Sequence, residues 1–332
     1  MKKQLRGMDL LSLSLKYCEY AEGRYSSKTY GEKKSVTLRL TEYFGPEFIV
    51  TDITPGLADK FLQVRNKERS ANSANKDRKN LSAMWNKAKK LKWIPGLEIN
   101  PWGVVEKFKH EKTPQYTPPL GDVLRVLSVA TRKELVFLYS YIYTGARRSE
   151  IMRWTWIDDI NFEKRKYRLG SRKTKDGSME YEWFSIPPEL YDELWWWWNN
   201  RTIKKSPYVF TDDQKGPHYG KRYTTRRRFM KGLCKRANKG IKDKEDKVTP
   251  FGFHALRRFF ASRMADLGKS TKTIQRFLRH KHLSTTERYI HDINKDMKGM
   301  TDGLLEVEDW KKKEDLPENL HVNLTHFSGK SS

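Results

Sequence analysis

The sequence predicts a mainly α protein with a small antiparallel β-sheet, arranged as a helical first domain and a mixed α/β second domain. Three observations support this prediction. Apolar residues recur at helical spacing through much of the first hundred residues, a segment rich in proline and lysine follows, and a hairpin signal then separates two further groups of helices.

The first domain, residues 1–107, is predicted to consist of helices. A helix near the start places three residues at helical spacing, Leu11, Leu15 and Cys18. Thr54 is the predicted N-cap of another helix, because Pro55 suits the first helical position. A later helix carries four apolar residues on one face, Leu81, Trp85, Ala88 and Leu91.

The second domain is predicted to span residues 122–300, after an exposed linker at 108–121. It starts with an apolar helix that runs into a turn at Gly145 and a further helix. The dipeptide Asp176-Gly177 then separates two runs of strand-forming residues. This arrangement is a strong signal for a β-hairpin.

Helices are predicted to complete the second domain. Four consecutive indoles, Trp195 to Trp198, cannot share one helix face, so we expect two in the core and the others over a neighbouring element or partner. Three short helices follow, one from His254, one around 273–278 and one that carries Tyr289.

The charge of the chain indicates a polyanionic partner. The formal net charge is +26, from 67 lysines and arginines against 41 aspartates and glutamates. Each phosphate that such a protein neutralises releases condensed counterions, which favours binding. A membrane partner is not expected, since no apolar run approaches the roughly 18 residues of a spanning helix. The two cysteines, Cys18 and Cys234, predict neither a disulfide scaffold nor a cysteine zinc site, which fits a reducing cytoplasm.

Two segments depart from the average charge. Residues 220–247 form the most basic stretch, where Arg226, Arg227 and Arg228 stand in succession and are predicted to contact phosphates through their guanidinium forks. Residues 301–332 hold seven acidic side chains against four lysines. Because this acidic tail is opposite in charge to the body of the chain, we expect it to pack on a neighbouring protomer.

Six residues of the second domain form a set suited to phosphoryl transfer without a metal: Arg147, Lys175, His254, Arg257, His280 and Tyr289. In such a reaction arginines neutralise the transition-state oxygens, a lysine or histidine handles protons and a hydroxyl attacks. On a helix His254 and Arg257 share a face. Glu150 follows Arg147 by one turn, so its carboxylate is expected to orient that guanidinium.

A metal site near Tyr289 is the competing interpretation of the histidines there. His280 and His282 are two residues apart, and neither a cysteine nor a neighbouring carboxylate pair completes a set of ligands. We therefore predict no metal site and no cofactor.

Five motifs, taken together and in this order, resemble the tyrosine recombinases, the family of phage-type integrases. They are TGARRSE at 144–150, TKDG at 174–177, HALR at 254–257, LRH at 278–280 and TTERYIH at 285–291. The helical first domain, with INPW before the linker, is similar to the core-binding domain of that family. The resemblance implies a tyrosine-recombinase catalytic domain in residues 122–300.

The resemblance also implies a role for each residue of the set. Tyr289 would attack a scissile phosphate and leave a 3′-phosphotyrosine and a free 5′-hydroxyl. Arg147 and Arg257 would clamp the non-bridging oxygens, and Lys175 would protonate the leaving 5′-oxygen. His254 would serve in acid–base or hydrogen-bonding support, and His280 would hydrogen-bond the phosphate. Glu150 matches an acidic supporting position.

One position departs from the pattern of the family, and one role has two candidate residues. Arg279 stands where the family commonly has glycine, so the helix before it lacks the residue that most easily adopts the left-handed conformation. The extra charge at Arg279 is expected to be available to DNA. Lys173 is a rival to Lys175 as the catalytic lysine, although Lys175 stands directly before the turn.

The implied activity is site-specific DNA recombination by an integrase of a phage or another mobile element, independent of ATP. Its partner would be double-stranded DNA, held by four protomers around two duplexes in the cytoplasm of the host cell. Six basic residues are assigned to DNA contact: Lys76, Lys79, Lys87, Arg226, Arg227 and Arg228. Two alternatives stay open, a non-catalytic DNA-binding regulator on the same scaffold and an enzyme similar to type IB topoisomerases.

Overall fold

The computed structural model describes residues 7–110, 115–171, 178–238, 241–242 and 248–291. The chain forms two compact units, residues 1–113 and 114–332, each with its own hydrophobic core. The border between them lies within the segment 108–121. The functional division of the chain into domains stays a prediction.

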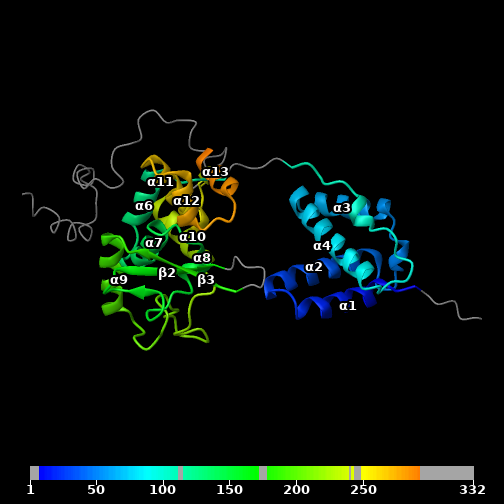
Figure 1. The fold of residues 1–332 in the computed structure, drawn as a ribbon, viewed down its shortest axis with the longest axis horizontal. Helices are drawn as coiled ribbons and strands as arrows, with labels where there is room; N and C mark the ends of the chain where they lie inside the picture. Colours follow the sequence, from blue (N-terminus) through cyan, green and yellow to red (C-terminus); the bar gives the residue numbers. More distant parts are fainter. Residues whose placement is uncertain (1–6, 111–114, 172–177, 239–240, 243–247, 292–332) are drawn as a thin grey trace, which may run out of the picture. The chain divides into compact units, whose positions relative to one another are not determined.

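Unit 1 is helical in its described residues (Figure 1). Its elements are α1 (Leu10–Glu22), α2 (Ser27–Phe44), a 3₁₀ helix (Val50–Asp52), α3 (Pro55–Glu68), α4 (Ala71–Lys90) and α5 (Pro101–Val104).

The helices of unit 1 begin where capping residues predict. The Thr54 side chain accepts a hydrogen bond from the Leu57 N–H, and Pro55 is the first residue of α3, which confirms that predicted start. The core is filled by Trp85 and Trp102, whose rings meet edge to face at 5.5 Å. The row of Leu11 and Leu15 lies on the exposed side of α1, and other apolar residues of that helix supply its buried side.

A buried carboxylate joins the three longest helices of unit 1. Asp77 of α4 accepts hydrogen bonds from Arg39 Nη2 of α2 at 2.6 Å and from Arg65 Nε of α3 at 3.0 Å. The two ion pairs offset the desolvation cost of burying this carboxylate.

Unit 2 combines helices with a small sheet. Its elements are α6 (Leu120–Ser128), α7 (Arg132–Ile142), α8 (Arg148–Ile151), β1 (Ile160–Asn161), β2 (Lys166–Ser171), β3 (Glu180–Ser185), α9 (Pro188–Asn200), α10 (Arg227–Ala237), β4 (Ile241–Lys242), β5 (Val248–Thr249), α11 (Phe253–Asp266), α12 (Thr271–Leu278) and α13 (Leu283–His291).

The prediction of one continuous helix at the start of unit 2 is wrong. The chain breaks between α6 and α7 because Thr131 caps a new helix, with Glu134 completing a capping box. The Thr131 N–H donates to the Glu134 carboxylate at 2.9 Å. The threonine–glutamate pair is a start signal that the apolar periodicity of the segment concealed.

The predicted hairpin is present as β2 and β3, which pair antiparallel from Lys166 opposite Ser185 to Ser171 opposite Glu180. The turn that contains Asp176 and Gly177 lies outside the described residues. Two features were not predicted: the short strand β1, which extends the sheet to three strands, and the separate pair β4–β5. Both are too short to leave a periodic pattern in the sequence.

The four indoles of α9 divide between core and surface. Only Trp197 is fully buried, so the prediction of two core indoles is wrong in number. Trp196 and Trp198 pack against the core from its edge, and Trp195 is exposed, with its ring beside Phe162.

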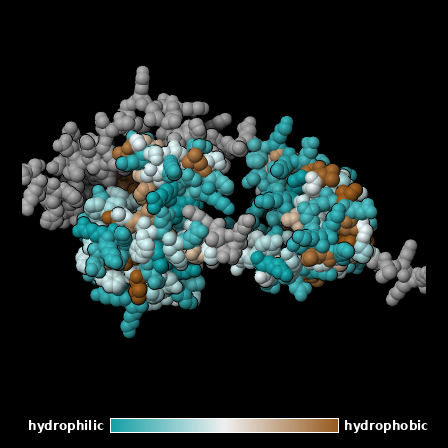
Figure 2. Space-filling model, in the orientation of Figure 1, coloured by the Kyte–Doolittle hydropathy of each residue, from teal (hydrophilic) through white to brown (hydrophobic). Residues whose placement is uncertain are grey.

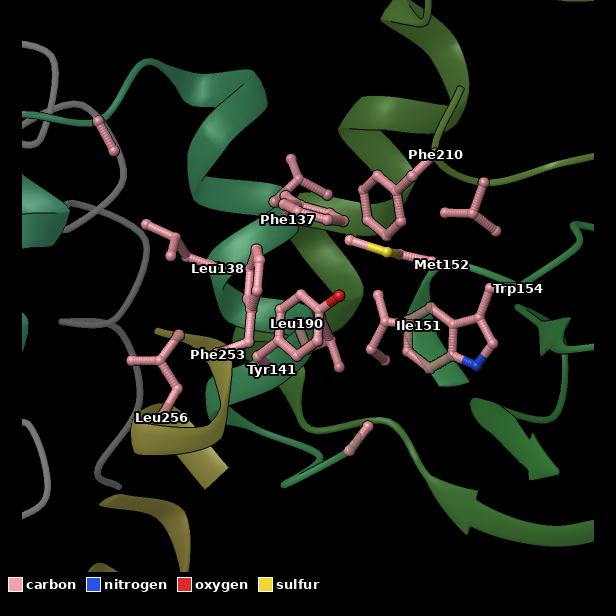
Figure 3. Close-up of a cluster of buried hydrophobic side chains, with 14 of the residues drawn as sticks. Phe137, Leu138, Tyr141, Ile151, Met152, Trp154, Leu190, Phe210, Phe253 and Leu256 are labelled. Atoms are coloured by element: carbon pink, nitrogen blue, oxygen red, sulfur yellow. The ribbon is translucent and has the colours of Figure 1, made fainter. Parts of the chain in front are cut away.

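Aromatic rings fill the core of unit 2 (Figure 3). The Phe137 ring of α7 meets Tyr141, Phe210 and Phe253 edge to face, at centroid distances of 5.2, 4.7 and 5.7 Å. This packing attaches the first residues of α11 to α7 and fixes the helix that carries His254 and Arg257.

The last three helices of unit 2 are present, as predicted, and they pack together. α11, α12 and α13 contact one another, and α11 also contacts α7 (Figure 1). Two turns with positive φ separate them, one at Gly268 (φ 70°) and one at Arg279 (φ 53°). These sharp turns fold the segments that carry the candidate site residues back onto one another.

The visible surface of the described residues is mostly hydrophilic, with small hydrophobic patches (Figure 2). Among the described helices, none has both the length and the apolar character to cross a membrane.

Gly145 is the glycine on which the geometry of the site depends. Its φ is +57°, and a Cβ built on it would lie 2.8 Å from Cε1 of Phe260. We expect Gly145→Ala to lower the free energy of unfolding by about 2–4 kcal/mol, because it adds both backbone strain and a clash. Urea denaturation measures this change. The control is Gly232→Ala in α10, where a Cβ meets nothing within 4 Å; we expect it to stabilise by about 0.5–1 kcal/mol. Equal stabilities of the two variants would contradict the prediction.

Candidate functional site

Arg147 lies where the Gly145 turn enters α8, as the N-cap of that helix. Its backbone N–H donates to Glu150 Oε2 at 2.7 Å, and its Nη1 donates to Glu150 Oε1 at 2.9 Å. The side chain is 40% exposed. The carboxylate therefore holds the guanidinium from the protein side and leaves it accessible to solvent, as the sequence predicted for Glu150.

Arg257 of α11 is buried directly beneath this turn, with 1% of its surface exposed. Its Nη1 donates to the Gly145 carbonyl at 2.6 Å, and its Nη2 donates to the Leu278 carbonyl. The segments 144–150 and 254–257, which contain Arg147 and Arg257, are thus in contact through this bond to Gly145.

Arg279 is buried, so the expectation that its charge is available to DNA is wrong. Only 1% of its side chain is exposed. Its Nη2 donates to Glu150 Oε2 at 2.6 Å, and its Nη1 donates to the Phe277 carbonyl at 2.6 Å. The residue itself adopts the left-handed conformation at the end of α12, with φ 53° and ψ 44°. The turn that glycine would form is therefore made by an arginine.

Glu150 is the shared acceptor of these two arginines. Burial raises the pKa of its carboxyl, but the charges of Arg279 and Arg147 and the bond from the Arg147 N–H lower it further, and the net pKa is below the ordinary value. The carboxylate is therefore ionised at neutral pH and joins α8 to the turn after α12.

His280 connects the site to α13. Its Nδ1 lies 2.9 Å from the Thr286 hydroxyl, and both residues are buried. Burial and the charges of Arg257, Arg147 and Arg279 lower the pKa of His280 to about 3. The ring is therefore neutral at pH 7, and it fixes the first turns of the helix that ends at His291.

His254 lies at the start of α11 on the exposed side of the site. Surrounding protein atoms and the charges of Arg258, Arg257 and Arg147 lower its pKa to about 4. The imidazole is therefore neutral at physiological pH, with one ring nitrogen unprotonated.

The structure does not describe the side chains of three predicted residues. Tyr289 belongs to α13, one turn after Thr286, and its side chain lies outside the described part of the chain. Lys175 and its rival Lys173 also lie outside the described residues. The roles of these three residues stay predictions.

The lysines assigned to DNA contact lie on one surface of unit 1. Lys76, Lys79 and Lys87 stand on α4, where Lys76 pairs with Glu32 at 2.9 Å. Lys87 lies 4.9 Å from the centroid of the Tyr20 ring, and its hydrogen bond lowers the pKa of Tyr20, helped by the charges of Arg24 and Lys90. We refer to Lys76, Lys79, Lys87, Lys90 and Arg24 as the α4 basic surface.

The three consecutive arginines of unit 2 lie at the start of α10 and differ in environment. Arg226 stacks over Tyr223, Phe229 and Phe137 at 4.2, 4.5 and 5.3 Å, which directs its guanidinium toward the protein. Arg228 is exposed. The side chain of Arg227 lies outside the described set.

Two residues of the site escaped prediction. Thr286 had no distinguishing feature in the sequence, since hydroxyl side chains are common on helices. The inward orientation of Arg279 had no signal in the sequence, because it depends on Glu150, which lies 129 positions away. Within the described residues, no group of three histidine, cysteine, aspartate or glutamate side chains is arranged to hold a metal ion.

Comparison with known proteins places this geometry in a family. The model of the phage integrase family matches residues 122–295. Tyrosine recombinase XerA of Pyrococcus furiosus is 30% identical over 277 residues, which cover 80% of this chain and 87% of that protein. The transposase of transposon Tn916 from Enterococcus faecalis is 28% identical over 167 residues, 44% of this chain and 39% of that protein.

Solved structures share the fold at lower identity. The lambda integrase dimer bound to a COC′ core site superposes with a TM-score of 0.67 at 17% identity, over 90% of this chain and 81% of that one. The integrase of transposon Tn1549, in complex with a circular intermediate DNA, gives a TM-score of 0.64 at 18% identity, over 85% and 95% of the two chains. By family model and by sequence identity over most of its length, the chain belongs to the phage integrase family of tyrosine recombinases.

Proposed function

We propose that this protein is an integrase of a phage or another mobile element that cleaves and rejoins DNA through Tyr289. The tyrosine oxygen forms a bond to the scissile phosphorus, and the bond from phosphorus to the 5′-oxygen breaks. The phenol proton passes to a neutral base, for which His254 is the candidate, and Lys175 gives a proton to the leaving 5′-oxygen. Attack of a 5′-hydroxyl on the 3′-phosphotyrosine reverses these steps and releases the enzyme, so the reaction needs no ATP.

One observation carries this proposal: Arg147, Arg257 and His280 converge beside the helix that contains Tyr289. The Arg257 guanidinium contacts the Gly145 turn before Arg147, and His280 contacts Thr286 in α13. Two guanidinium groups held in place before the substrate arrives stabilise the charge of a pentavalent phosphorus without reorganisation.

The partner in this proposal is double-stranded DNA, which the lambda and Tn1549 integrases bind in their solved complexes. The α4 basic surface and Arg228 are the candidate phosphate contacts, with Arg226 in a supporting place against its three rings. Recombination would assemble four protomers on two duplexes in the host cytoplasm, with the acidic tail 301–332 packed on a neighbour. The relationship to a transposon transposase supports a mobile element as the source of the reaction.

Covalent capture tests the nucleophile. The substrate is a nicked duplex that contains the site protected by the protein in a footprint of the DNA flanking its coding sequence. We expect the wild-type protein to form a covalent adduct resistant to denaturant, and Tyr289→Phe to form none while its DNA affinity stays within about twofold, because only the attacking oxygen is removed. Gel electrophoresis of labelled DNA measures the adduct.

The alternatives predict different outcomes of the same assay. A non-catalytic regulator gives a footprint without any adduct from the wild type. A topoisomerase-like enzyme relaxes supercoiled plasmids that lack the protected site, and Tyr289→Phe abolishes that relaxation too.

The salt dependence of DNA binding tests the α4 basic surface. Each phosphate contact contributes about 0.9 to the slope of log K against log salt. Lys79→Ala with Lys87→Ala should therefore reduce the slope by about 2 on a duplex of 30 or so base pairs, measured by fluorescence anisotropy. The control is the pair Lys60→Ala and Lys67→Ala on α3, which removes the same charge. A slope reduced equally by both pairs would refute a local contact.

The low pKa of His280 predicts a pH dependence of stability. Its folded pKa is about 3 and its ordinary value is 6.5, so in this interval the unfolded chain binds a proton that the folded chain does not. Above pH 6.5 this proton has no effect on the free energy of unfolding. Below pH 6.5 the free energy of unfolding decreases as the pH falls. The wild type should lose stability between pH 6.5 and 5 more steeply than His280→Gln, by up to about 1.4 kcal/mol per pH unit. Urea denaturation at several pH values measures both slopes, and parallel curves would count against the predicted protonation state.

A further inference from the structure

Arg279 combines two features, each of which lowers the stability of the folded protein. A residue with a Cβ in the left-handed region is strained, and glycine would form the same turn without strain. A buried guanidinium also loses its hydration. The structure places both in one residue at the end of α12, with φ 53° and 1% of the side chain exposed.

The contacts of Arg279 show what this arrangement accomplishes. Its Nη2 reaches Glu150 Oε2 at 2.6 Å, and the other oxygen of Glu150 receives Arg147 Nη1 at 2.9 Å. The carbonyl of Arg279 receives Arg147 Nη2 at 3.4 Å. One residue therefore contacts the Arg147 guanidinium by two routes, through the shared carboxylate and through its own backbone.

The neighbouring arginine of the same helix provides a contrast. Arg276 also pairs with a glutamate, Glu182, at 3.0 Å, but its side chain is 79% exposed. An exposed pair of this kind contributes little and is easily exchanged with water. The buried pair of Arg279 and Glu150 is different in kind, because water does not replace either partner.

We propose that Arg279 is a positioning residue for DNA cleavage, which fixes the Arg147 guanidinium against the scissile phosphate through the buried Glu150 carboxylate and through its own carbonyl oxygen. This inference rests on the proposed function, since it concerns the rate of the cleavage step. It also accounts for the presence of arginine where glycine would form the turn more easily.

The proposal makes the charge of Glu150 depend on Arg279. In Arg279→Gly the turn keeps its backbone conformation, but the buried carboxylate has one hydrogen-bonded arginine instead of two. Its protonated form then becomes accessible at higher pH, and protonation releases Arg147. A displaced catalytic group costs rate more than substrate affinity.

The test compares single-turnover cleavage of the nicked duplex with DNA affinity, from pH 5.5 to 8.5. For Arg279→Gly we expect cleavage to be about 10- to 100-fold slower with affinity within about twofold, and the acid limb of the rate profile to move toward neutral pH. Adding Glu150→Gln to this variant should remove the shift of the acid limb. Arg279→Lys should recover part of the rate, because one ammonium restores the charge but not both hydrogen bonds. Arg276→Ala is the matched control and should match the wild type.

The outcomes separate the two proposals. If the wild type forms no adduct, the proposed function fails, whatever Arg279 does. If the wild type cleaves and Arg279→Gly keeps its rate and pH profile, the positioning role is overturned. A parallel loss of rate and affinity without a change of pH profile also overturns it, since that is the signature of a structural role. Should Arg279→Gly not fold, Arg279→Lys decides by the same criteria.

Discussion

The buried guanidinium of Arg257 is the constraint on which the rest of the site depends. It donates to the carbonyls of Gly145 and Leu278, which belong to segments separated by more than 130 residues. A backbone carbonyl is a fixed acceptor, so these bonds set the distance between the turn before α8 and the end of α12. The placement of Arg147, Glu150 and Arg279 follows from that distance.

The same arrangement concentrates positive charge. Three arginines surround one carboxylate, and surrounding protein atoms and nearby arginines keep both histidines neutral. Such a cluster is unfavourable to the folded protein by itself and favourable to any tetrahedral oxyanion that enters it. Sites of this kind lower the stability of the folded protein but hold charged groups in position before the substrate binds, which is common where catalysis occurs.

The sequence predicted the elements of the fold better than the contacts between them. The hairpin, the start of α3 and the three closing helices all leave local signals, a turn dipeptide, a cap and short apolar periods. The break before α7 was missed because apolar periodicity outweighed the capping pair of Thr131 and Glu134. The strands β1, β4 and β5 comprise two residues each and carry no period at all.

In the candidate site, too, local motifs predicted the residues better than the contacts between them. Arg147, Arg257 and His280 were identified by motifs; the structure brings them together, and their roles stay predictions. Whether a charged side chain points inward or outward depends on partners distant in sequence, and for this reason Arg279 was assigned to DNA although Glu150 holds it inside. The contact between Thr286 and His280 is likewise a tertiary property.

The ion pair between Glu150 and Arg279 has a consequence for how this protein diverges. The two codons are 129 positions apart, yet loss of Glu150 leaves the buried guanidinium of Arg279 without its anionic partner, whereas loss of Arg279 leaves Glu150 paired with Arg147 alone. Substitution of the glutamate is thus penalised more than substitution of the arginine, so a lineage that abandons the pair can replace the arginine first. Within descendants of this chain, the arginine is therefore expected only together with the glutamate.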